Sequence, residues 1–130
     1  MNIPEDLKYT ESDEWVRVEG DTATTGVTDY AQDQLSDIVY VEYVADVGDT
    51  LAKGGAHSAV ESVKAAADVY MPVGGTIEAV NEALTESPEL INSDPYGQAW
   101  LVKFKISDPS ELDGLMDAAA YKKYCEEREH

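Results

Sequence analysis

Histidine, the commonest general base, occurs twice in this chain of 130 residues, at His57 and at the last position, His130. A nucleophilic triad needs a serine or cysteine beside such a base, with an acid to orient it. His57-Ser58 is the one adjacent pair of this kind, but neighbouring residues of a strand point to opposite faces. We therefore expect His57 to be a partly exposed strand residue and the chain to contain no catalytic residue.

Metal and phosphate sites have no better support in the sequence. The carboxylates are numerous but spread, without the spacing of an EF-hand loop, and Cys125 is the single cysteine. Gly54-Gly55 and Gly74-Gly75 lack the Gly-Lys-Ser/Thr continuation of a phosphate-binding loop, so we interpret both pairs as turns. We expect no metal site, and we expect Cys125 to be an inert thiol near an exposed terminus.

The stretch "AVESVKAAADVYMPVGG" (59–75) contains one lysine, Lys64, between two strand-like runs. A hairpin joined at Val63-Lys64 would place this lysine at its tip, and the small neighbour Ala65 would leave the amine open. A Schiff-base lysine needs burial to lower its pKa, whereas a protruding tip keeps the amine solvated. The geometry therefore suits a lysine that another enzyme modifies. Spacing alone favours the simpler alternative, an ordinary solvated lysine.

The formal net charge of −18 excludes some classes of partner. Nucleic acids and anionic membrane surfaces both require a basic face, so we expect neither as a partner. Two interpretations of the acidity stay open together: solubility in a salty cytosol, and steering toward partners with basic docking surfaces. The chain shows no transmembrane or secretory segment. We expect a cytoplasmic protein, or a mitochondrial one only if a transit peptide has been removed.

Strand signals dominate the chain up to residue 106, where β-branched and aromatic runs alternate with glycine turns. They predict a hairpin over 14–28 that turns at Gly20-Asp21, and further strands over 38–44, 57–62, 67–73, 74–80 and 99–106. Such short strands predict a mainly β fold, a small sandwich or flattened barrel. We expect its core to contain Trp15, Val39, Val41, Val60, Val69, Ile77, Val80, Trp100, Val102, Phe104 and Ile106.

Helix signals occur at two places. Thr28 is the expected N-cap of about two helical turns in the first half of the chain. Near the C-terminus, Asp108 as N-cap, Pro109 at the first position and Glu111 as capping-box partner predict a helix, and Asp117 can cap a final helix over 118–130.

The segment 81–98 is rich in turn formers, and we expect a loop with one helical turn at most. No linker divides the chain. The sequence therefore predicts a single domain over 1–130, with a core of about 8–106 and a C-terminal helical extension of about 108–127.

The segment "ESVKAAADVYMPVGG" (61–75) resembles the lipoyl-attachment hairpin of glycine cleavage system H proteins. The segments 8–42, 81–105 and 107–121 resemble the same family, in order and with similar spacing, so the resemblance covers nearly the whole chain. Biotin carriers typically place Met on both sides of their lysine, and lipoyl domains of 2-oxoacid dehydrogenases usually read Asp-Lys-Ala. This chain has Val63-Lys64-Ala65. All three groups share the barrel-sandwich hybrid fold, which the resemblance therefore implies.

The resemblance implies a non-catalytic carrier with lipoate attached to Lys64 as N6-lipoyllysine, within an attachment motif formed by Glu61, Ser62, Val63 and Ala65. Such a carrier takes an aminomethyl group from glycine decarboxylase (P protein) to aminomethyltransferase (T protein), and electrons to dihydrolipoamide dehydrogenase (L protein). Lipoylating enzymes would be further partners, and a monomer is expected. One alternative is an H-like protein used for lipoyl relay or stress-linked deacylation. Another is an interaction module in which Lys64 stays unmodified.

In that family the loaded arm folds back into a cleft, and the matching positions here are Ser12, Glu14 and Asp68. Two carboxylates would favour the cationic form of the carried group. The alternative for Glu14 and Asp68 is a pair of solvated strand-edge acids. Asp13 stands where the family usually has His, which would add an acid near the cleft. Gly is common in the family where this chain has Ser36 and Ala99.

Overall fold

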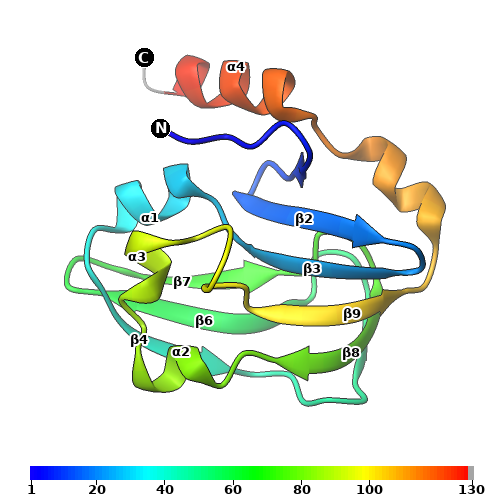
Figure 1. Cartoon of the computed structure of the whole chain (residues 1–130), viewed down its shortest axis with the longest axis horizontal. Helices are drawn as coiled ribbons and strands as arrows, with labels where there is room; N and C mark the ends of the chain where they lie inside the picture. Colours follow the sequence, from blue (N-terminus) through cyan, green and yellow to red (C-terminus); the bar gives the residue numbers. More distant parts are fainter. Residues whose placement is uncertain (129–130) are drawn as a thin grey trace.

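The computed structural model describes residues 1–128, so His130 and the end of the final helix expected over 118–130 lie outside the described residues. Strands make up most of the elements, with helices between and after them (Figure 1). The strands are β1 (Lys8–Tyr9), β2 (Glu14–Glu19), β3 (Thr22–Val27), β4 (Ile38–Tyr43), β5 (Thr50–Leu51), β6 (Ala56–Ser62), β7 (Ala66–Tyr70), β8 (Gly75–Val80) and β9 (Val102–Ile106). The helices are α1 (Asp29–Leu35), α2 (Ala83–Glu86), α3 (Leu90–Ser93), the 3-10 helix η1 (Pro109–Gly114) and α4 (Ala118–Arg128).

The strands form two antiparallel sheets. One has six strands in the order β1-β2-β3-β9-β8-β5, and the other has three in the order β4-β6-β7. Val27 of the large sheet packs in one buried cluster with Val41, Val60 and Val69 of the small sheet, so the sheets are joined by a shared core. Within residues 1–128 the strands do not close into a barrel. The mainly β barrel-sandwich hybrid expected from the sequence is thus confirmed.

The hairpin predicted over 14–28 is confirmed. β2 and β3 pair from Glu14 opposite Val27 to Glu19 opposite Thr22, and Gly20 at the turn has a φ of +68°. A left-handed φ of this kind favours glycine because a Cβ would approach the following backbone. The turn residues therefore fix the register of this hairpin.

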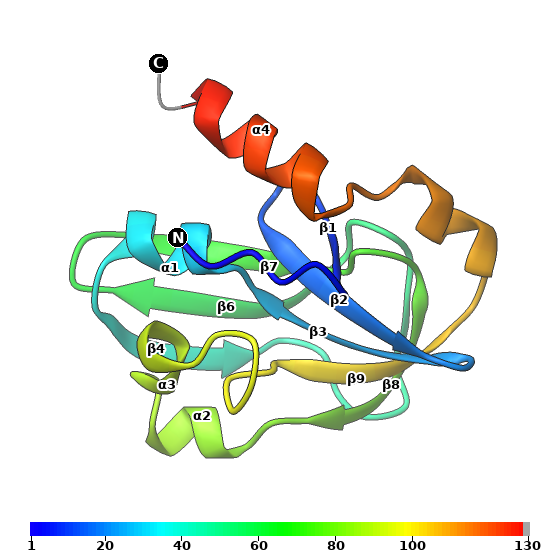
Figure 2. The same ribbon diagram turned by 45° about the horizontal axis from the view of Figure 1, so that its top comes forward.

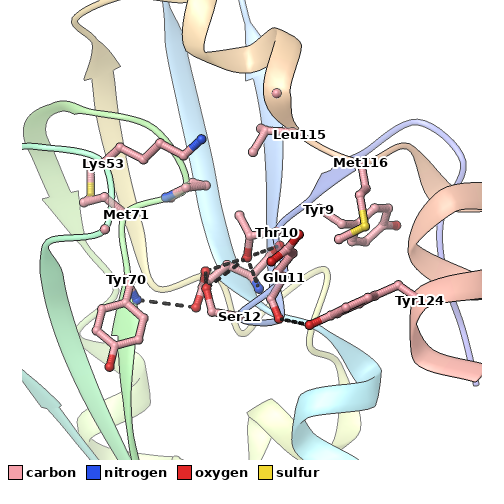
Figure 3. A pocket seen from close by; sticks show the side chains of 14 residues that line it. Tyr9, Thr10, Glu11, Ser12, Lys53, Tyr70, Met71, Leu115, Met116 and Tyr124 are labelled. Atoms are coloured by element: carbon pink, nitrogen blue, oxygen red, sulfur yellow. Dashed lines mark hydrogen bonds between the residues drawn. The ribbon is translucent and has the colours of Figure 1, made fainter. Parts of the chain in front are cut away.

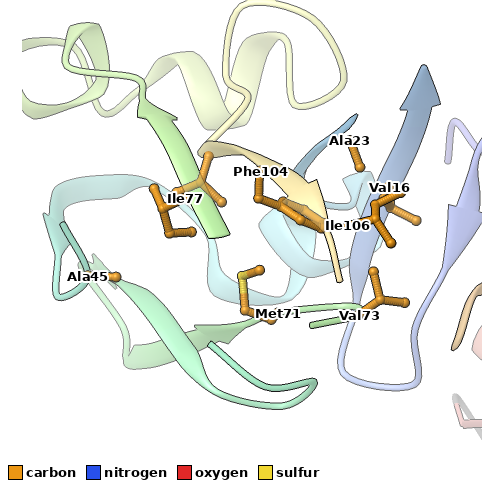
Figure 4. Close-up of a cluster of buried hydrophobic side chains, with 9 residues drawn as sticks. Val16, Ala23, Ala45, Met71, Val73, Ile77, Phe104 and Ile106 are labelled. Carbon is orange, nitrogen blue, oxygen red and sulfur yellow. The ribbon is translucent and has the colours of Figure 1, made fainter. Parts of the chain in front are cut away.

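A second buried cluster joins β8 and β9 of the large sheet to the segment after β7 (Figure 4). Phe104 of β9 and Ile77 of β8 are almost fully buried in it, beside Met71. Gly75 lies where these elements meet, and an added Cβ would stand 2.4 Å from the Lys105 carbonyl oxygen. The strand β8 can therefore pack this closely against β9 only because residue 75 has no side chain.

Eight of the eleven predicted core residues are buried, and three are not. Val39 is 54% exposed. The reason is a register shift between Ile38 and Tyr40 in the pairing of β4 with β6, which turns Ile38 inward and Val39 outward. Val80 and Trp100 are half-buried, and Trp100 lies before β9 with the Lys103 amine 4.7 Å from its ring centre.

Helix α4 covers β1 at the edge of the large sheet, as both ribbon views show (Figure 2). Its Tyr121 ring stacks on Tyr9 with ring centres 4.7 Å apart, and Cys125 in the next turn is fully buried. The expectation that Cys125 lies near an exposed terminus is therefore wrong, because the helix buries the face that carries it.

The N-cap predictions are confirmed, but the capping box is wrong. The Thr28 hydroxyl accepts the Ala31 N–H at 3.1 Å, and Asp117 accepts the Ala120 N–H at 2.8 Å. Asp108 accepts the Ser110 N–H at 3.0 Å and begins the 3-10 helix η1. The Glu111 carboxylate does not accept the Asp108 backbone N–H, as a capping box requires. It accepts the Gly74 N–H instead, at 2.8 Å.

The segment 81–98 is more helical than expected, with the two short helices α2 and α3. Each contributes one fully buried side chain, Leu84 and Ile91, to the cluster between the sheets. Tertiary burial thus stabilises two single helical turns that are too short to be stable in isolation. Among residues 1–128, no helix is both long enough and apolar enough to cross a membrane.

Candidate functional site

Lys64 lies at the tip of the β6–β7 hairpin, as predicted. β6 ends at Ser62 and β7 begins at Ala66, and the Ser62 N–H donates to the Ala65 carbonyl at 2.7 Å. The Ser62 hydroxyl oxygen accepts the N–H groups of Lys64 at 3.1 Å and Ala65 at 2.9 Å. The hydroxyl of Ser62 therefore holds the turn from inside and fixes the direction of Lys64.

The neighbours of the lysine hold the hairpin in place. Val63 is 70% exposed, but its N–H donates to the Asp37 carbonyl at 3.0 Å, which ties the tip to the start of β4. Glu61 is exposed and pairs with Tyr40 on one side and Ala66 on the other. The tip is thus ordered by backbone bonds, while its side chains stay accessible.

The Lys64 side chain is exposed, and its amine donates one hydrogen bond, to the Gln34 carbonyl of α1 at 3.1 Å. An amine with a single exposed partner can be freed at small cost, because water replaces that hydrogen bond. The structure therefore leaves the nitrogen available to an acylating enzyme.

A cleft of about 620 Å³, here named the Glu14 cleft, lies between the β1–β2 turn, the end of β7 and the segment that leads into α4 (Figure 3). Ser12 comes from the turn and Glu14 begins β2, while Tyr70 ends β7 and Met71 follows it. The complete lining is Tyr9, Thr10, Glu11, Ser12, Glu14, Lys53, Gly54, Tyr70, Met71, Pro72, Gly114, Leu115, Met116 and Tyr124.

Glu14 is 2% exposed, so the interpretation of a solvated strand-edge acid is wrong for this residue. The hydroxyls of Thr10 and Ser12 both donate to its Oε1 at 2.6 Å. The Thr10 oxygen also accepts the Glu14 N–H at 3.0 Å, so its own proton is directed to the carboxylate. Burial raises the pKa of Glu14, and the hydroxyl hydrogen bonds oppose that rise in part.

No ion pair forms with Glu14 among residues 1–128. Its Oε2 has one weak contact, 3.5 Å from the Tyr70 N–H. A buried carboxylate with one oxygen satisfied by hydroxyls and the other nearly free is a good acceptor for a cationic or N–H-bearing group. The second oxygen of Glu14 can therefore accept a hydrogen bond from a small cationic group in the cleft.

Asp68 lies outside the lining of the Glu14 cleft. It is exposed in β7 opposite Ala59, and strand alternation puts it on the same face as Ala66 and Tyr70. Tyr70 does line the cleft, so Asp68 is roughly 7 Å along the strand from that wall. The structure brings Ser12 and Glu14 together and leaves Asp68 between the cleft and Lys64.

Asp13 lies outside the lining of the cleft, although its charge adds to the rise in the pKa of Glu14. It has a φ of +73° and turns toward α4, where its carboxylate accepts the Tyr121 hydroxyl at 2.8 Å and pairs with Arg128 at 2.7 Å. At this position, where the family resemblance would place a histidine, Asp13 therefore contacts the C-terminal helix.

His57 is fully buried, so the expectation of partial exposure is wrong. A register shift between Ala56 and Ser58 in the β6–β7 pairing lets His57 Nδ1 approach the Ser58 hydroxyl at 2.6 Å, although strand neighbours normally diverge. Nε2 has no hydrogen-bond partner within residues 1–128. Burial lowers the pKa of His57 to about 4, and the residue does not line the Glu14 cleft.

No group of three His, Cys, Asp or Glu side chains within residues 1–128 is arranged to hold a metal ion. Several residues of the cleft were not predicted as site residues, above all Thr10, Lys53, Tyr70 and Tyr124. Thr10 lies in the turn before β2, where strand alternation does not apply, so the sequence offers no periodic signal for it. The others come from distant parts of the chain that only the fold brings together.

Known proteins match this chain over nearly its whole length. The family model described as "Glycine cleavage H-protein" matches residues 7–128. The glycine cleavage system H protein of Halothermothrix orenii is 52% identical over 129 residues, which are 99% of this chain and all of that protein. Glycine cleavage system H protein 2, mitochondrial, of Arabidopsis thaliana is 52% identical over 127 residues, 98% of this chain and 81% of that protein.

The solved structures agree with the sequences. The crystal structure of a glycine cleavage system H protein from Mycobacterium marinum superposes with a TM-score of 0.84 at 31% identity, over 98% of this chain and 100% of that one. The match therefore extends over both sheets and the C-terminal helices, beyond the lysine hairpin. The chain belongs to the glycine cleavage H-protein family.

Proposed function

We propose that this chain is the lipoyl-bearing carrier of a glycine cleavage system, with lipoate attached to Lys64. The observation that carries the proposal is an exposed lysine on an ordered hairpin tip, on the strand that leads to a cleft with a buried carboxylate. When bound as an amide, lipoate would supply a dithiolane that accepts an aminomethyl group and electrons. The protein itself catalyses no step.

The residues at the tip fit this group. An acylating enzyme needs a lysine that protrudes and neighbours that do not crowd it, and Ala65 and Ala66 are both small and exposed. Ser62 keeps the lysine at the apex through the hydrogen bonds of its hydroxyl oxygen. The motif of Glu61, Ser62, Val63 and Ala65 thus supplies register and order, and Lys64 supplies the nitrogen.

The Glu14 cleft would hold the cationic end of the cargo. Thr10 and Ser12 donate to one oxygen of Glu14, which favours the charged carboxylate. Glu14 would then accept from an ammonium group, and Ser12 would supply a hydroxyl near the cleft mouth. Met71, Leu115 and Met116 provide apolar walls that keep water away from the cargo. Asp68 would attract the same cation on its way along β7.

The partners follow from this role. We infer that glycine decarboxylase, aminomethyltransferase, dihydrolipoamide dehydrogenase and a lipoylating enzyme each dock at the exposed hairpin, and that the carrier acts as a monomer. The net charge of −18 favours partner surfaces that are basic. A cytoplasmic location is part of the same proposal.

Intact mass spectrometry of the natively expressed protein tests the attachment. A mass increase of one lipoyl group is expected in the native chain and not in Lys64→Arg. The matched control Lys53→Arg changes a lysine that lines the cleft and should keep the adduct. Absence of the adduct from the native chain would overturn every carrier role.

Reconstituted glycine–bicarbonate exchange with glycine decarboxylase tests the pathway. Exchange should depend on the lipoylated chain and be lost in Lys64→Arg. A lipoylated chain that supports no exchange would point instead to lipoyl relay, which the comparisons do not support.

A further inference from the structure

The turn from Thr10 to Glu14 has two sides. Ser12 and Glu14 face the Glu14 cleft, while Asp13 and the carbonyl of Glu11 face helix α4. Backbone bonds make the turn one unit, because the Asp13 N–H donates to the Thr10 carbonyl at 3.2 Å and the Thr10 N–H donates to the Glu14 carbonyl at 3.0 Å. A displacement of Asp13 is therefore transmitted to Glu14.

Asp13 is held in a conformation that few side chains adopt. Its φ of +73° lies in the left-handed region, which is unfavourable for a residue with a Cβ. The carboxylate accepts from both terminal nitrogens of Arg128, at 2.7 and 3.2 Å, and from the Tyr121 hydroxyl at 2.8 Å. Three donors from α4 thus hold this backbone, which would otherwise relax.

Arg128 is itself held in place by two aromatic rings. Its guanidinium lies 4.2 Å from the Tyr30 ring centre and 4.4 Å from that of Tyr124. The ion pair is partly shielded, with side-chain exposures of 27% for Arg128 and 19% for Asp13. Tyr124 also lines the Glu14 cleft, and its hydroxyl donates to the Glu11 carbonyl at 3.2 Å. The cation therefore connects α1, α4 and the β1–β2 turn.

We propose that Arg128 and Asp13 form a clamp by which helix α4 positions Ser12 and Glu14 in the Glu14 cleft. Arg128 is a positioning residue, since it acts on the cleft only through Asp13 and the turn. The pair sets how deeply the Glu14 carboxylate is held and how firmly the hydroxyls of Thr10 and Ser12 cover it. Any effect of this clamp on protection of the cargo rests on the proposed function. The clamp itself is present in the chain without lipoate.

The test is NMR titration of the Glu14 carboxyl in the full, unlipoylated chain, for wild type and Arg128→Met. Loss of the clamp loosens the turn and admits water, so the pKa of Glu14 should fall toward its ordinary value. Loss of a positive charge without movement would do the opposite and raise the pKa of Glu14. Weaker hydroxyl hydrogen bonds in a loosened turn would also raise this pKa, but burial is the larger influence, so a net fall indicates positioning.

Amide hydrogen exchange gives a second readout on the same samples. The N–H groups of Asp13 and Glu14 should exchange severalfold faster in Arg128→Met, while Val60 and Val69 in the shared core should not change. The matched control is Lys123→Met, which removes the same charge from α4 at a side chain that is 79% exposed and pairs with Glu127 at 3.9 Å. It should leave both readouts unchanged.

Arg128→Lys keeps the charge but not the two-nitrogen contact, and an intermediate effect on both readouts is expected. This variant replaces Arg128→Met if that one fails to fold. An unchanged or raised Glu14 pKa together with unchanged exchange in the variant that folds would overturn the clamp. Because no lipoate is present, that result would leave the lipoyl role of Lys64 untouched, and a missing adduct at Lys64 would leave the clamp untouched.

Discussion

Glu14 lies almost fully buried with hydroxyl donors on one oxygen and no cationic partner among residues 1–128. Such a site gains most from a ligand that brings its own positive charge, because the carboxylate has already lost its water. This environment is what the proposed binding of a cationic cargo at Glu14 would use.

Glu14→Gln should raise the rate at which a loaded carrier releases methylamine. A hydrogen bond to a charged group stabilises by about 1.5–3 kcal/mol, so the rate should increase roughly tenfold to a hundredfold. Glu19→Gln, at the exposed end of β2, is the matched control and should release at the wild-type rate. Equal rates in all three proteins would remove Glu14 from the protection of the cargo.

His57 makes a second prediction at the residue scale, on acid stability. Its pKa is lowered by burial to about 4 from the ordinary 6.5, so the folded state favours the neutral ring. Above about pH 6.5 the ring is neutral in both states, and the folded protein has its full stability. As the pH falls toward 4 the unfolded ring gains a proton that the folded ring does not, so stability is lost. When the pH falls from 7 to 4.5, the free energy of unfolding should decrease by roughly 2 kcal/mol more in the wild type than in His57→Gln.

Urea unfolding of both proteins at the two pH values measures this difference, and the carboxylates that titrate in the same range cancel in the comparison. A parallel loss in wild type and variant would show that His57 does not control acid stability. The sequence could not predict this behaviour, because the burial of His57 depends on the register shift between β6 and β7.

At the scale of elements, the sequence predicted caps and turns correctly wherever the hydrogen-bond partner lay within a few residues. Thr28 and Asp117 cap their helices as expected, and Gly20 turns the β2–β3 hairpin. Prediction failed where a distant partner competed, as for Glu111, whose carboxylate binds the Gly74 N–H instead of its own helix. It failed again at Val39, where a bulge reverses the faces of β4.

The end of α1 offers a stability prediction of the same kind. Ser36 has a φ of +69° and a ψ of −151°, a region that is essentially restricted to glycine. Ser36→Gly should therefore stabilise the protein by about 1 kcal/mol, since relief of strain exceeds the greater freedom of glycine in the unfolded chain. Thermal or urea unfolding measures the change.

Ser93→Gly in α3 is the matched control, because this serine is exposed in a helix and a glycine there should destabilise. Ser36→Gly with unchanged or lower stability would show that the C-cap of α1 carries no strain. The family's frequent glycine at this position then has a backbone reason that the sequence alone did not reveal.

At the scale of the whole molecule, the lysine and the cleft were predictable to different degrees. The position of Lys64 depends on one two-strand hairpin only, and the strand signals on both sides of the lysine predict that hairpin from the local sequence. The cleft needs the β1–β2 turn, the end of β7, the loop at Lys53 and the segment that leads into α4. Ser12 and Glu14 could be placed by family resemblance, but the participation of Lys53, Tyr70 and Tyr124 depends on how distant segments pack.

The charge of the whole chain makes the last prediction. With a formal net charge of −18, and with Glu42, Glu61 and Asp68 exposed on the small sheet that bears Lys64, the field should attract basic partner surfaces to the hairpin. The association rate with aminomethyltransferase, one of the proposed partners, should fall at least about tenfold between 20 and 500 mM salt, because screening shortens the reach of that field. Stopped-flow fluorescence measures the rate.

Glu42→Gln/Glu61→Gln should weaken the salt dependence, whereas the control Glu19→Gln/Glu86→Gln, which removes equal charge elsewhere, should not. Identical salt dependence in the two double variants would mean that the position of the removed charges does not matter and that only the total charge does. An association rate independent of salt would exclude electrostatic steering altogether.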